Sequence, residues 1–160
     1  MTAPTAPDAQ GRITISADPD TVYALITDLP TLSSLAEEAE TMHWRTGEVA
    51  RPGAVFSGRN RNGSRTWSTT CTVTAAESGR TFAFDVRSAR IIPIAHWRYD
   101  ITAADGGCSV TESTWDRRPR WLLRPAALTT GVRDRNAANT EHIRLTLQRL
   151  KERAEQGSTA

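Results

Sequence analysis

Glu112 is the residue whose type and position most clearly allow chemistry. It follows Val110 at a spacing of two in a segment with strand-like alternation, so the two side chains are expected on one face. A carboxyl group among apolar and aromatic side chains has a raised pKa and can act as a general acid or base. Tyr99, in another alternating segment, is the second candidate catalytic residue. An ion pair with Arg98 or Arg59, or a position at an exposed rim, would instead make Glu112 structural.

Other residues that could form a phosphate-binding, metal or nucleophile site do not have the spacing that such a site requires. Gly58 and Gly63 have the separation seen in a phosphate-binding loop, but Ser64 stands where that loop needs a lysine, and the segment is typical of a hairpin. No histidine has a partner at metal-ligand spacing. The three histidines are His43, His96 and His142. The sequence also lacks a Gly-x-Ser-x-Gly turn for a nucleophilic serine. It therefore predicts neither a metal nor a cofactor.

Period-two alternation predicts strands through most of the chain. A short β-branched run at 12–16 comes first, and alternation follows near residues 42–44, 56–60, 67–74, 82–86, 97–101 and 108–114. Asn62-Gly63 favours a type I′ hairpin, because both central residues of that turn need positive φ. Further tight turns are expected at Ser78-Gly79 and Asp105-Gly106-Gly107.

Three helices are predicted around these strands. Asp18 is suited to cap a helix whose first position is Pro19, and Pro30 separates that helix from a second short one over about 31–36. The last helix is the clearest and is expected over 132–155. Its apolar stripe repeats at spacings of three and four: Val132, Asn136, Asn139, Ile143, Leu147, Leu150 and Ala154.

This order predicts an α+β fold, a curved antiparallel sheet of six to seven strands wrapped around the long C-terminal helix. That helix is the only predicted element able to cover an apolar concave face. We expect one domain over residues 11–156, with a disordered leader at 1–10 and a tail at 157–160. Because the leader lacks the basic and apolar regions of a signal peptide, a cytoplasmic location is expected.

Composition excludes two broad classes. No stretch approaches the ~20 apolar residues that span a bilayer, so stable membrane insertion is not expected. Five Trp, three Phe and two Tyr are too many for a wholly disordered chain. The net charge of +2 favours no acidic partner, and nucleic-acid binding is not expected. Cys71 and Cys108 are too few for a disulfide framework and are expected to be buried thiols.

The order of elements resembles the helix-grip fold of the SRPBCC superfamily, which includes START lipid-transfer domains and bacterial polyketide cyclases. Motifs between residues 12 and 155 are similar to the polyketide cyclase/dehydrase-type bacterial branch. They are Ile13-Thr14-Ile15-Ser16-Ala17-Asp18-Pro19-Asp20-Thr21-Val22-Tyr23, Phe56-x-Gly58-x-Asn60, Trp67, Trp97-x-Tyr99 and Gly106-Gly107-Cys108-x-Val110-Thr111-Glu112. The resemblance implies a ligand cavity between the sheet and the last helix. It does not choose between binding and catalysis, since this scaffold hosts both.

The inward faces of the predicted elements nominate the cavity lining. The candidate ligand-binding residues are Trp44, Phe56, Asn60, Trp67, Thr69, Phe84, Trp97, Tyr99, Glu112, Asn136, Asn139, Thr140 and Ile143. Met42, Val110 and Thr114 share the same faces. For each aromatic the alternative is simple core packing, and for the two asparagines it is capping of the helix end. Buried polar groups need partners, because an unpaired one costs roughly 1–3 kcal/mol.

The segment 117–135 combines six arginines with Trp121, Leu122 and Leu123 and is expected to be irregular. It is interpreted as a solvated loop, as a gate at the cavity mouth, or as a contact with an anionic membrane or a carrier protein. These interpretations stay open.

The sequence predicts a protein that holds a hydrophobic small molecule, such as a polyketide, a lipid or another secondary metabolite. The alternative is an enzyme of the cyclase, aromatase or dehydratase type acting in the same cavity. A third class is an adaptor that uses the arginine-rich segment. A monomer or a homodimer is expected.

Overall fold

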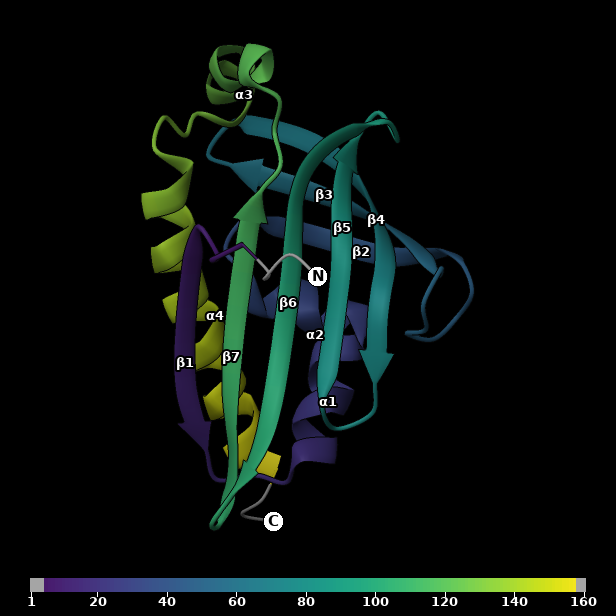
Figure 1. Cartoon of the computed structure of the whole chain (residues 1–160), viewed down its shortest axis with the longest axis vertical. Helices are drawn as coiled ribbons and strands as arrows, with labels where there is room; N and C mark the ends of the chain where they lie inside the picture. The colour runs from purple at the N-terminus through teal and green to yellow at the C-terminus, as the bar shows by residue number, and fades with distance from the viewer. Residues whose placement is uncertain (1–4, 158–160) are drawn as a thin grey trace.

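A seven-stranded antiparallel sheet organises the computed structural model, which describes residues 5–157 (Figure 1). Its strand order is β1-β7-β6-β5-β4-β3-β2, so only β1 leaves the order of a simple meander. The strands are β1 Ala9–Ile15, β2 Ala39–Thr46, β3 Val55–Asn62, β4 Arg65–Glu77, β5 Thr81–Ser88, β6 Ile92–Ala104 and β7 Gly107–Asp116. The helices are α1 Pro19–Thr27, α2 Leu29–Leu35, the 3₁₀ turn η1 Arg120–Leu122, α3 Leu123–Thr130 and α4 Arg135–Gly157. The predicted α+β class and helix-grip architecture are confirmed.

The hairpins follow the turn chemistry read from the sequence. Gly63 has φ +61° between β3 and β4, and Gly106 has φ +74° between β6 and β7. Both are conformations that glycine adopts without the cost other residues meet. Gly79 likewise has φ +69° between β4 and β5. These turns set antiparallel registers in which the inward side chains of neighbouring strands lie opposite one another, such as Phe84 with Trp97 and Tyr99 with Glu112.

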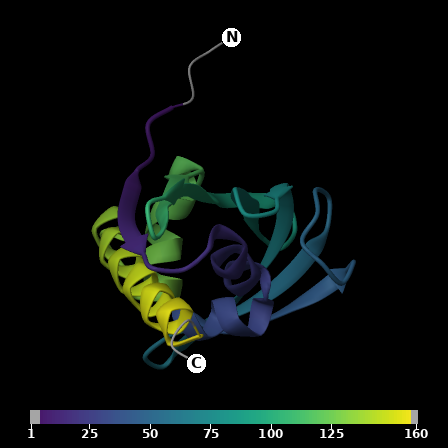
Figure 2. The same cartoon turned by 90° about the horizontal axis from the view of Figure 1, so that it is seen from below.

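The two short helices after β1 lie between the curved sheet and the C-terminal helix (Figure 2). Pro19 occupies the first turn of α1, and Asp18 is its N-cap residue, although the Asp18 side chain makes no capping hydrogen bond. Asp28 caps α2 by accepting a hydrogen bond from the backbone N–H of Thr31. The buried faces of these helices contribute Val22, Ile26, Leu29, Leu32 and Leu35 to the core.

The long helix α4 packs across β1 and β7. Ile143 and Leu147 are buried there, and a Cβ on Gly11 of β1 would lie only 2.6 Å from Ile143 Cγ2. Gly11 therefore permits the close approach of helix and sheet. Thr146, Leu150 and Ala154 continue the buried face toward the C-terminus. The predicted helix is confirmed, but it begins at Arg135, so Val132 lies outside it.

Three boundaries differ from the sequence expectations. Strand β1 begins at Ala9, because Ala9 and Gln10 pair with Thr114 and Ser113 of β7; the expected leader 1–10 is therefore too long. The segment expected to be irregular contains η1 and α3. Gly157 still belongs to α4. Residues 1–4 of the leader and 158–160 of the tail lie outside the described residues.

Cys71 and Cys108 are buried free thiols, as expected. Within residues 5–157, no helix is long and apolar enough to cross a membrane.

Candidate functional site

A cavity of about 290 Å³ lies between the concave face of the sheet, α2, the start of α4 and the η1–α3 segment. Most of its wall is apolar. The sheet contributes inward residues of β2 to β7, and the η1–α3 segment contributes Leu122, Pro125 and Ala126. The cavity therefore joins residues that lie more than a hundred positions apart in the chain, such as Leu32 and Thr146.

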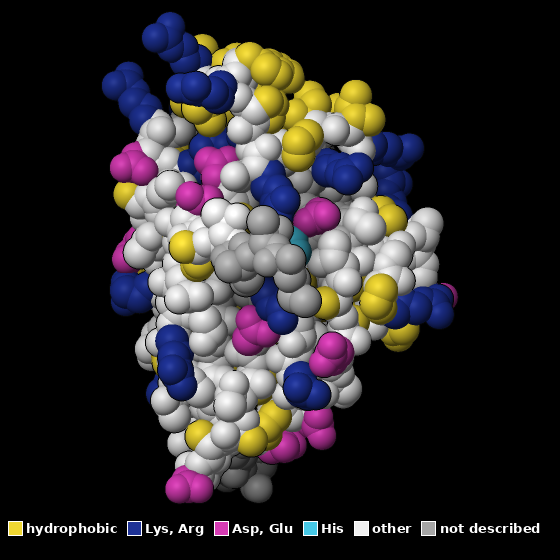
Figure 3. All heavy atoms as spheres, in the orientation of Figure 1, with side chains coloured by type: hydrophobic (Ala, Val, Ile, Leu, Met, Phe, Trp, Pro, Cys, Tyr) yellow, Lys and Arg dark blue, Asp and Glu magenta, His cyan; other side chains and the backbone are white. Residues whose placement is uncertain are grey.

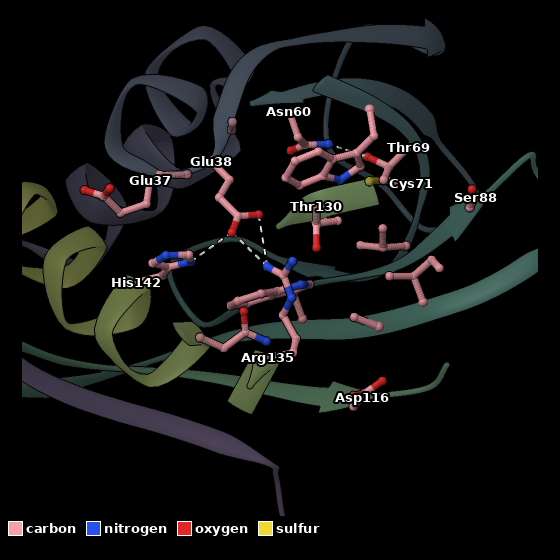
Figure 4. Close-up of a pocket in the computed structure, with 18 of the residues that line it drawn as sticks. Glu37, Glu38, Asn60, Thr69, Cys71, Ser88, Asp116, Thr130, Arg135 and His142 are labelled. Carbon is pink, nitrogen blue, oxygen red and sulfur yellow. Dashed lines mark hydrogen bonds and ion pairs between the residues drawn. The ribbon is translucent and has the colours of Figure 1, made fainter. Parts of the chain in front are cut away.

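Eight of the candidate binding residues line this cavity: Asn60, Trp67, Thr69, Phe84, Trp97, Tyr99, Glu112 and Asn139. Met42 also lines it. The period-two interpretation of β3 to β7 thus places these side chains on one concave surface. Asn60 Nδ2 donates a hydrogen bond to Thr69 Oγ1 at 3.3 Å across β3 and β4 (Figure 4).

The other candidates do not line the cavity. Phe56 is fully buried in the core and holds Trp44 edge-to-face at 5.5 Å between ring centroids. Ile143 is buried against Gly11 of β1. Asn136 and Thr140 are exposed, because the stripe of α4 that packs inward begins only at Asn139 and Thr140 lies about 100° further around the helix.

Val110 and Thr114, which share the inward faces of β7, are also absent from the cavity wall. Val110 is fully buried core. Thr114 Oγ1 donates a hydrogen bond to the backbone carbonyl of His96 at 3.1 Å. On β7, Glu112 is thus the residue between them that reaches the cavity.

Glu112 and Tyr99 form a buried polar pair in the cavity wall. Tyr99 Oη donates a hydrogen bond to Glu112 Oε1 at 2.7 Å, and both residues are 3% exposed. Glu112 Oε2 is buried and has no hydrogen-bond partner among the described residues. Neither arginine proposed as an ion-pair partner reaches Glu112, since Arg98 pairs with Asp100 and Arg59 with Glu40.

Burial is the largest influence on the pKa values of both residues. It raises the pKa of Glu112 to about 8, although the hydrogen bond from Tyr99 acts in the opposite direction. Burial, together with the neighbouring carboxyl, raises the pKa of Tyr99 well above 10. At neutral pH the protonated form of both groups is therefore favoured. Glu112 can donate a hydrogen bond from Oε2, accept one, or supply a proton to a bound molecule.

Two ion pairs also line the cavity. Arg135 Nη1 donates to both carboxylate oxygens of Glu38, at 2.8 and 3.0 Å. His142 Nδ1 lies 3.8 Å from Glu38 Oε1, so Glu38 stands between the arginine and the histidine (Figure 4). All three side chains are mostly buried. They come from α4 and from the turn between α2 and β2.

Arg118 and Asp116 form the second ion pair, through several hydrogen bonds that include Arg118 Nε to Asp116 Oδ1 at 2.9 Å. Burial alone would raise the pKa of Asp116, but the hydrogen bonds from Arg118 and the charges of Arg118 and Arg135 lower it overall. Both carboxylates are thus neutralised by arginines. This part of the wall offers a ligand balanced polar groups and no unpaired charge.

Sequence reasoning missed these five residues. In the sequence, Arg118 and Arg135 stand out only as members of the basic segment, and no pattern marks Glu38 or Asp116 as inward-facing. The sequence pattern rejects His142 as a metal ligand and gives it no other role. One signal was available for His142, because it lies three residues after Asn139 and therefore on the same face of the helix.

The cavity wall offers neither a reactive thiol nor a metal site among the described residues. Burial raises the pKa of Cys71 to about 12, so its thiol is not a ready nucleophile. Among residues 5–157 no group of three or more histidine, cysteine, aspartate or glutamate side chains is arranged to hold a metal.

Helix α3 follows β7 and η1 in the chain and precedes α4, and it covers the cavity. Its inner side lines the wall with Pro125, Ala126, Thr129 and Thr130. Residues of the β3–β4 hairpin hold its C-terminal end: Asn62 Nδ2 donates to the carbonyl of Thr130 at 2.8 Å, and Arg65 Nε donates to that of Leu128 at 2.9 Å. The segment thus forms part of the cavity wall, whereas the sequence left open a solvated loop, a gate at the cavity mouth, or a contact with an anionic membrane or a carrier protein.

Solved structures resemble the whole fold. The solution structure of the Polyketide_cyc-like protein Cgl2372 from Corynebacterium glutamicum is 26% identical, with a TM-score of 0.61 over 91% of this chain and 90% of that protein. DR_A0006 from Deinococcus radiodurans is 18% identical, with a TM-score of 0.66 over 93% of this chain and 97% of that protein.

StfQ, a di-domain ARO/CYC protein of the steffimycin biosynthetic pathway, has a TM-score of 0.73 at 10% identity. The match covers 94% of this chain and 51% of StfQ, and at this identity it shows a shared fold. No curated protein matches the sequence. The family model described as polyketide cyclase/dehydrase and lipid transport matches residues 6–155, almost the entire sequence, and the chain therefore belongs to this family.

Proposed function

We propose that this protein binds a hydrophobic small molecule in the cavity and holds its polar group against Glu112 and Tyr99. The observation that carries the proposal is the unpartnered Oε2 of Glu112 on a mostly apolar wall whose ion pairs are internally balanced. A buried polar atom without a partner is costly, and a bound ligand that hydrogen-bonds to it removes that cost.

The volume and shape of the cavity support a compact ligand. At about 290 Å³ it lies at the lower end of the range for small-molecule sites. Trp67, Trp97 and Phe84 offer flat apolar surfaces, which suit fused aromatic rings. A carbonyl or hydroxyl group on such a ring system would meet the protonated carboxyl of Glu112.

A thermal-shift and fluorescence screen with polycyclic aromatics, fatty acids and sterols tests the proposal. A ligand that binds only the folded state at about 100 times its Kd stabilises it by about 2.7 kcal/mol, which for a chain of this size raises Tm by about 5–10 °C. Trp97→Ala is expected to remove most of the shift. Trp115→Ala is the matched control, because Trp115 lies on the neighbouring strand β7 but does not line the cavity.

The location of the ligand follows from comparing the Tm shift of wild type, Trp97→Ala and Trp115→Ala. An equal shift in wild type and Trp97→Ala would place the ligand elsewhere. A screen in which no compound moves either Tm or tryptophan fluorescence contradicts small-molecule binding and favours the adaptor interpretation.

The second candidate is an enzyme of the cyclase or dehydratase type. It is favoured by Glu112, whose pKa of about 8 suits a general acid at neutral pH. Glu112→Gln separates the two functions, since the amide keeps the shape and neutrality of the protonated acid but cannot transfer a proton. A carrier keeps its affinity in this variant, whereas an enzyme keeps its affinity and loses turnover. The cytoplasmic location and the monomeric or homodimeric state stay predictions.

A further inference from the structure

The outer side of the cover over the cavity carries exposed apolar side chains. Trp121, Leu123 and Leu128 are 66%, 41% and 76% exposed. Ile91, in the β5–β6 turn at the same end of the molecule, is 77% exposed (Figure 1). Figure 3 shows hydrophobic side chains gathered at this end, with basic side chains around them. Large side chains this exposed in one region mark an interaction site.

Four arginines of the same segment are also exposed. They are Arg117, Arg120, Arg124 and Arg133. Within residues 5–157 no carboxylate lies at ion-pair distance from any of them, whereas Arg118 and Arg135 of the same segment are paired inside the cavity wall. We call the four arginines together with Trp121, Leu123 and Leu128 the cap surface. Its arginines carry uncompensated positive charge, so its partner is expected to be anionic.

The cap surface is the reverse side of the cavity wall. Helix α3 turns Pro125, Ala126 and Thr129 inward, while Arg124 and Leu128, four residues apart, share its outer side. The same short helix thus separates the apolar cavity from the exposed apolar and basic surface. A partner bound to the cap surface would therefore lie on the outer side of the segment whose inner side lines the cavity.

We propose that the cap surface docks on an anionic lipid bilayer, so that the segment covering the cavity faces the membrane. Leucines and a tryptophan set among arginines match the boundary between headgroups and acyl chains, where the apolar side chains leave water and the guanidinium groups meet phosphates. A nucleic acid would pair with the arginines but leave Leu123 and Leu128 in water. Docking of this kind is peripheral and reversible, in agreement with the absence of a membrane-spanning helix among the described residues.

Vesicle flotation of the full chain tests this proposal. Wild type is expected to float with vesicles of phosphatidylcholine containing about 30 mol % phosphatidylglycerol and not with phosphatidylcholine alone. Raising NaCl from about 0.05 to 0.5 M should release it, because exposed charges are then screened. The Arg120→Gln/Arg124→Gln variant should lower the partition coefficient about thirtyfold, at about fivefold for each arginine.

Two further variants complete the design. Trp121→Ala/Leu128→Ala should weaken binding to anionic vesicles at least about tenfold, through lost apolar burial. Arg51→Gln/Arg153→Gln removes the same charge from exposed positions outside the cap surface and should change partitioning by about twofold or less. All the substituted side chains are exposed, so circular dichroism should show unchanged folding.

Several outcomes would overturn the proposal. They are no flotation of wild type at low salt, equal flotation with neutral vesicles, or an equal effect of the cap and control variants. A dimer in light scattering that Trp121→Ala/Leu128→Ala dissociates, without vesicle binding, would assign the cap surface to a second copy of the chain instead. The proposal does not depend on ligand binding, and its failure would leave the cavity function untouched.

Discussion

The buried carboxyl of Glu112 lowers the stability of the fold and is also the group best placed to contact a ligand. Its carboxyl is 3% exposed and accepts a hydrogen bond from Tyr99, and within residues 5–157 it makes no ion pair. A core optimised for stability alone would place an apolar residue at this position, because burying a half-satisfied polar group costs free energy. The position of the free Oε2 on the cavity wall gives that cost a functional reason.

The free energy of unfolding should depend on pH because of this carboxyl. Its pKa is about 8 in the folded protein, against an ordinary value of 4.5 for a glutamate in the unfolded chain. Below pH 4.5 the group is protonated in both states and contributes nothing. As the pH rises toward 8, the unfolded chain ionises and the folded protein does not, so stability falls. Since each pKa unit corresponds to 1.36 kcal/mol, the loss is on the order of several kcal/mol.

Urea unfolding of wild type and Glu112→Gln at pH 5, 6, 7 and 8 measures this loss. The variant is expected to gain stability relative to wild type steadily across this range. Glu48→Gln, in the exposed turn between β2 and β3, is the control and should follow wild type. A constant difference between Glu112→Gln and wild type from pH 5 to 8 would mean that Glu112 ionises normally in the folded protein.

At the scale of the element, α4 depends on one buried face. Leu147 is 2% exposed and packs toward Gly11 of β1, whereas Leu145 is only partly buried. The two leucines lie about 200° apart around the helix. The same substitution at these positions therefore separates burial from the intrinsic helix preference of leucine and alanine.

Leu147→Ala is expected to destabilise the protein by about 2–5 kcal/mol, through lost burial and a cavity. Leu145→Ala should cost about 1 kcal/mol or less. Chemical denaturation of both variants at the same pH gives the comparison. Equal losses would show that α4 is rotated relative to its described position on the sheet.

At the scale of the whole molecule, the sheet joins the two ends of the chain. Strand β1 pairs with β7 over its full length, for example Ile13 with Val110, and α4 packs on β1. Most of the apolar core forms one cluster shared by the sheet, α1, α2 and α4. Within residues 5–157 no group of elements has a separate core that would let it unfold alone, so unfolding is expected to be cooperative.

Coincident transitions are the expected result when urea unfolding is followed by far-ultraviolet circular dichroism and by tryptophan fluorescence. The tryptophans sample distant elements, with Trp44 in β2, Trp67 in β4, Trp97 in β6 and Trp115 in β7. An early loss of helical signal, before the fluorescence changes, would show that α4 detaches from an intact sheet.

The sequence by itself determined the features that depend on local periodicity. Alternation at period two assigned the inward faces of β3 to β7, so Trp67, Trp97, Tyr99 and Glu112 could be placed on one wall. Repeats of three and four residues identified the buried stripe of α4 from Asn139 onward. These patterns are reliable because each strand and helix must bury one face of its own residues, whatever its neighbours are.

Helix α3 shows where local signals fail. It is short, contains Pro125 near its start and has leucines that face solvent, so it lacks the apolar stripe that marks a helix. Pro125 is tolerated because the first turn of a helix has no internal partner for its N–H groups. Contacts from Asn62 and Arg65 of a distant hairpin hold the helix in place, and no local pattern in the sequence encodes them.

Only the tertiary structure decided which polar side chains meet. Glu38 and Arg135 are 97 positions apart, and their ion pair exists because α4 crosses the turn that follows α2. Tyr99 became the partner of Glu112, in place of Arg98 or Arg59, because the register of β6 on β7 sets the two residues side by side. Such pairings depend on register and on the angle between packed elements, which arise from the sum of many contacts along the chain.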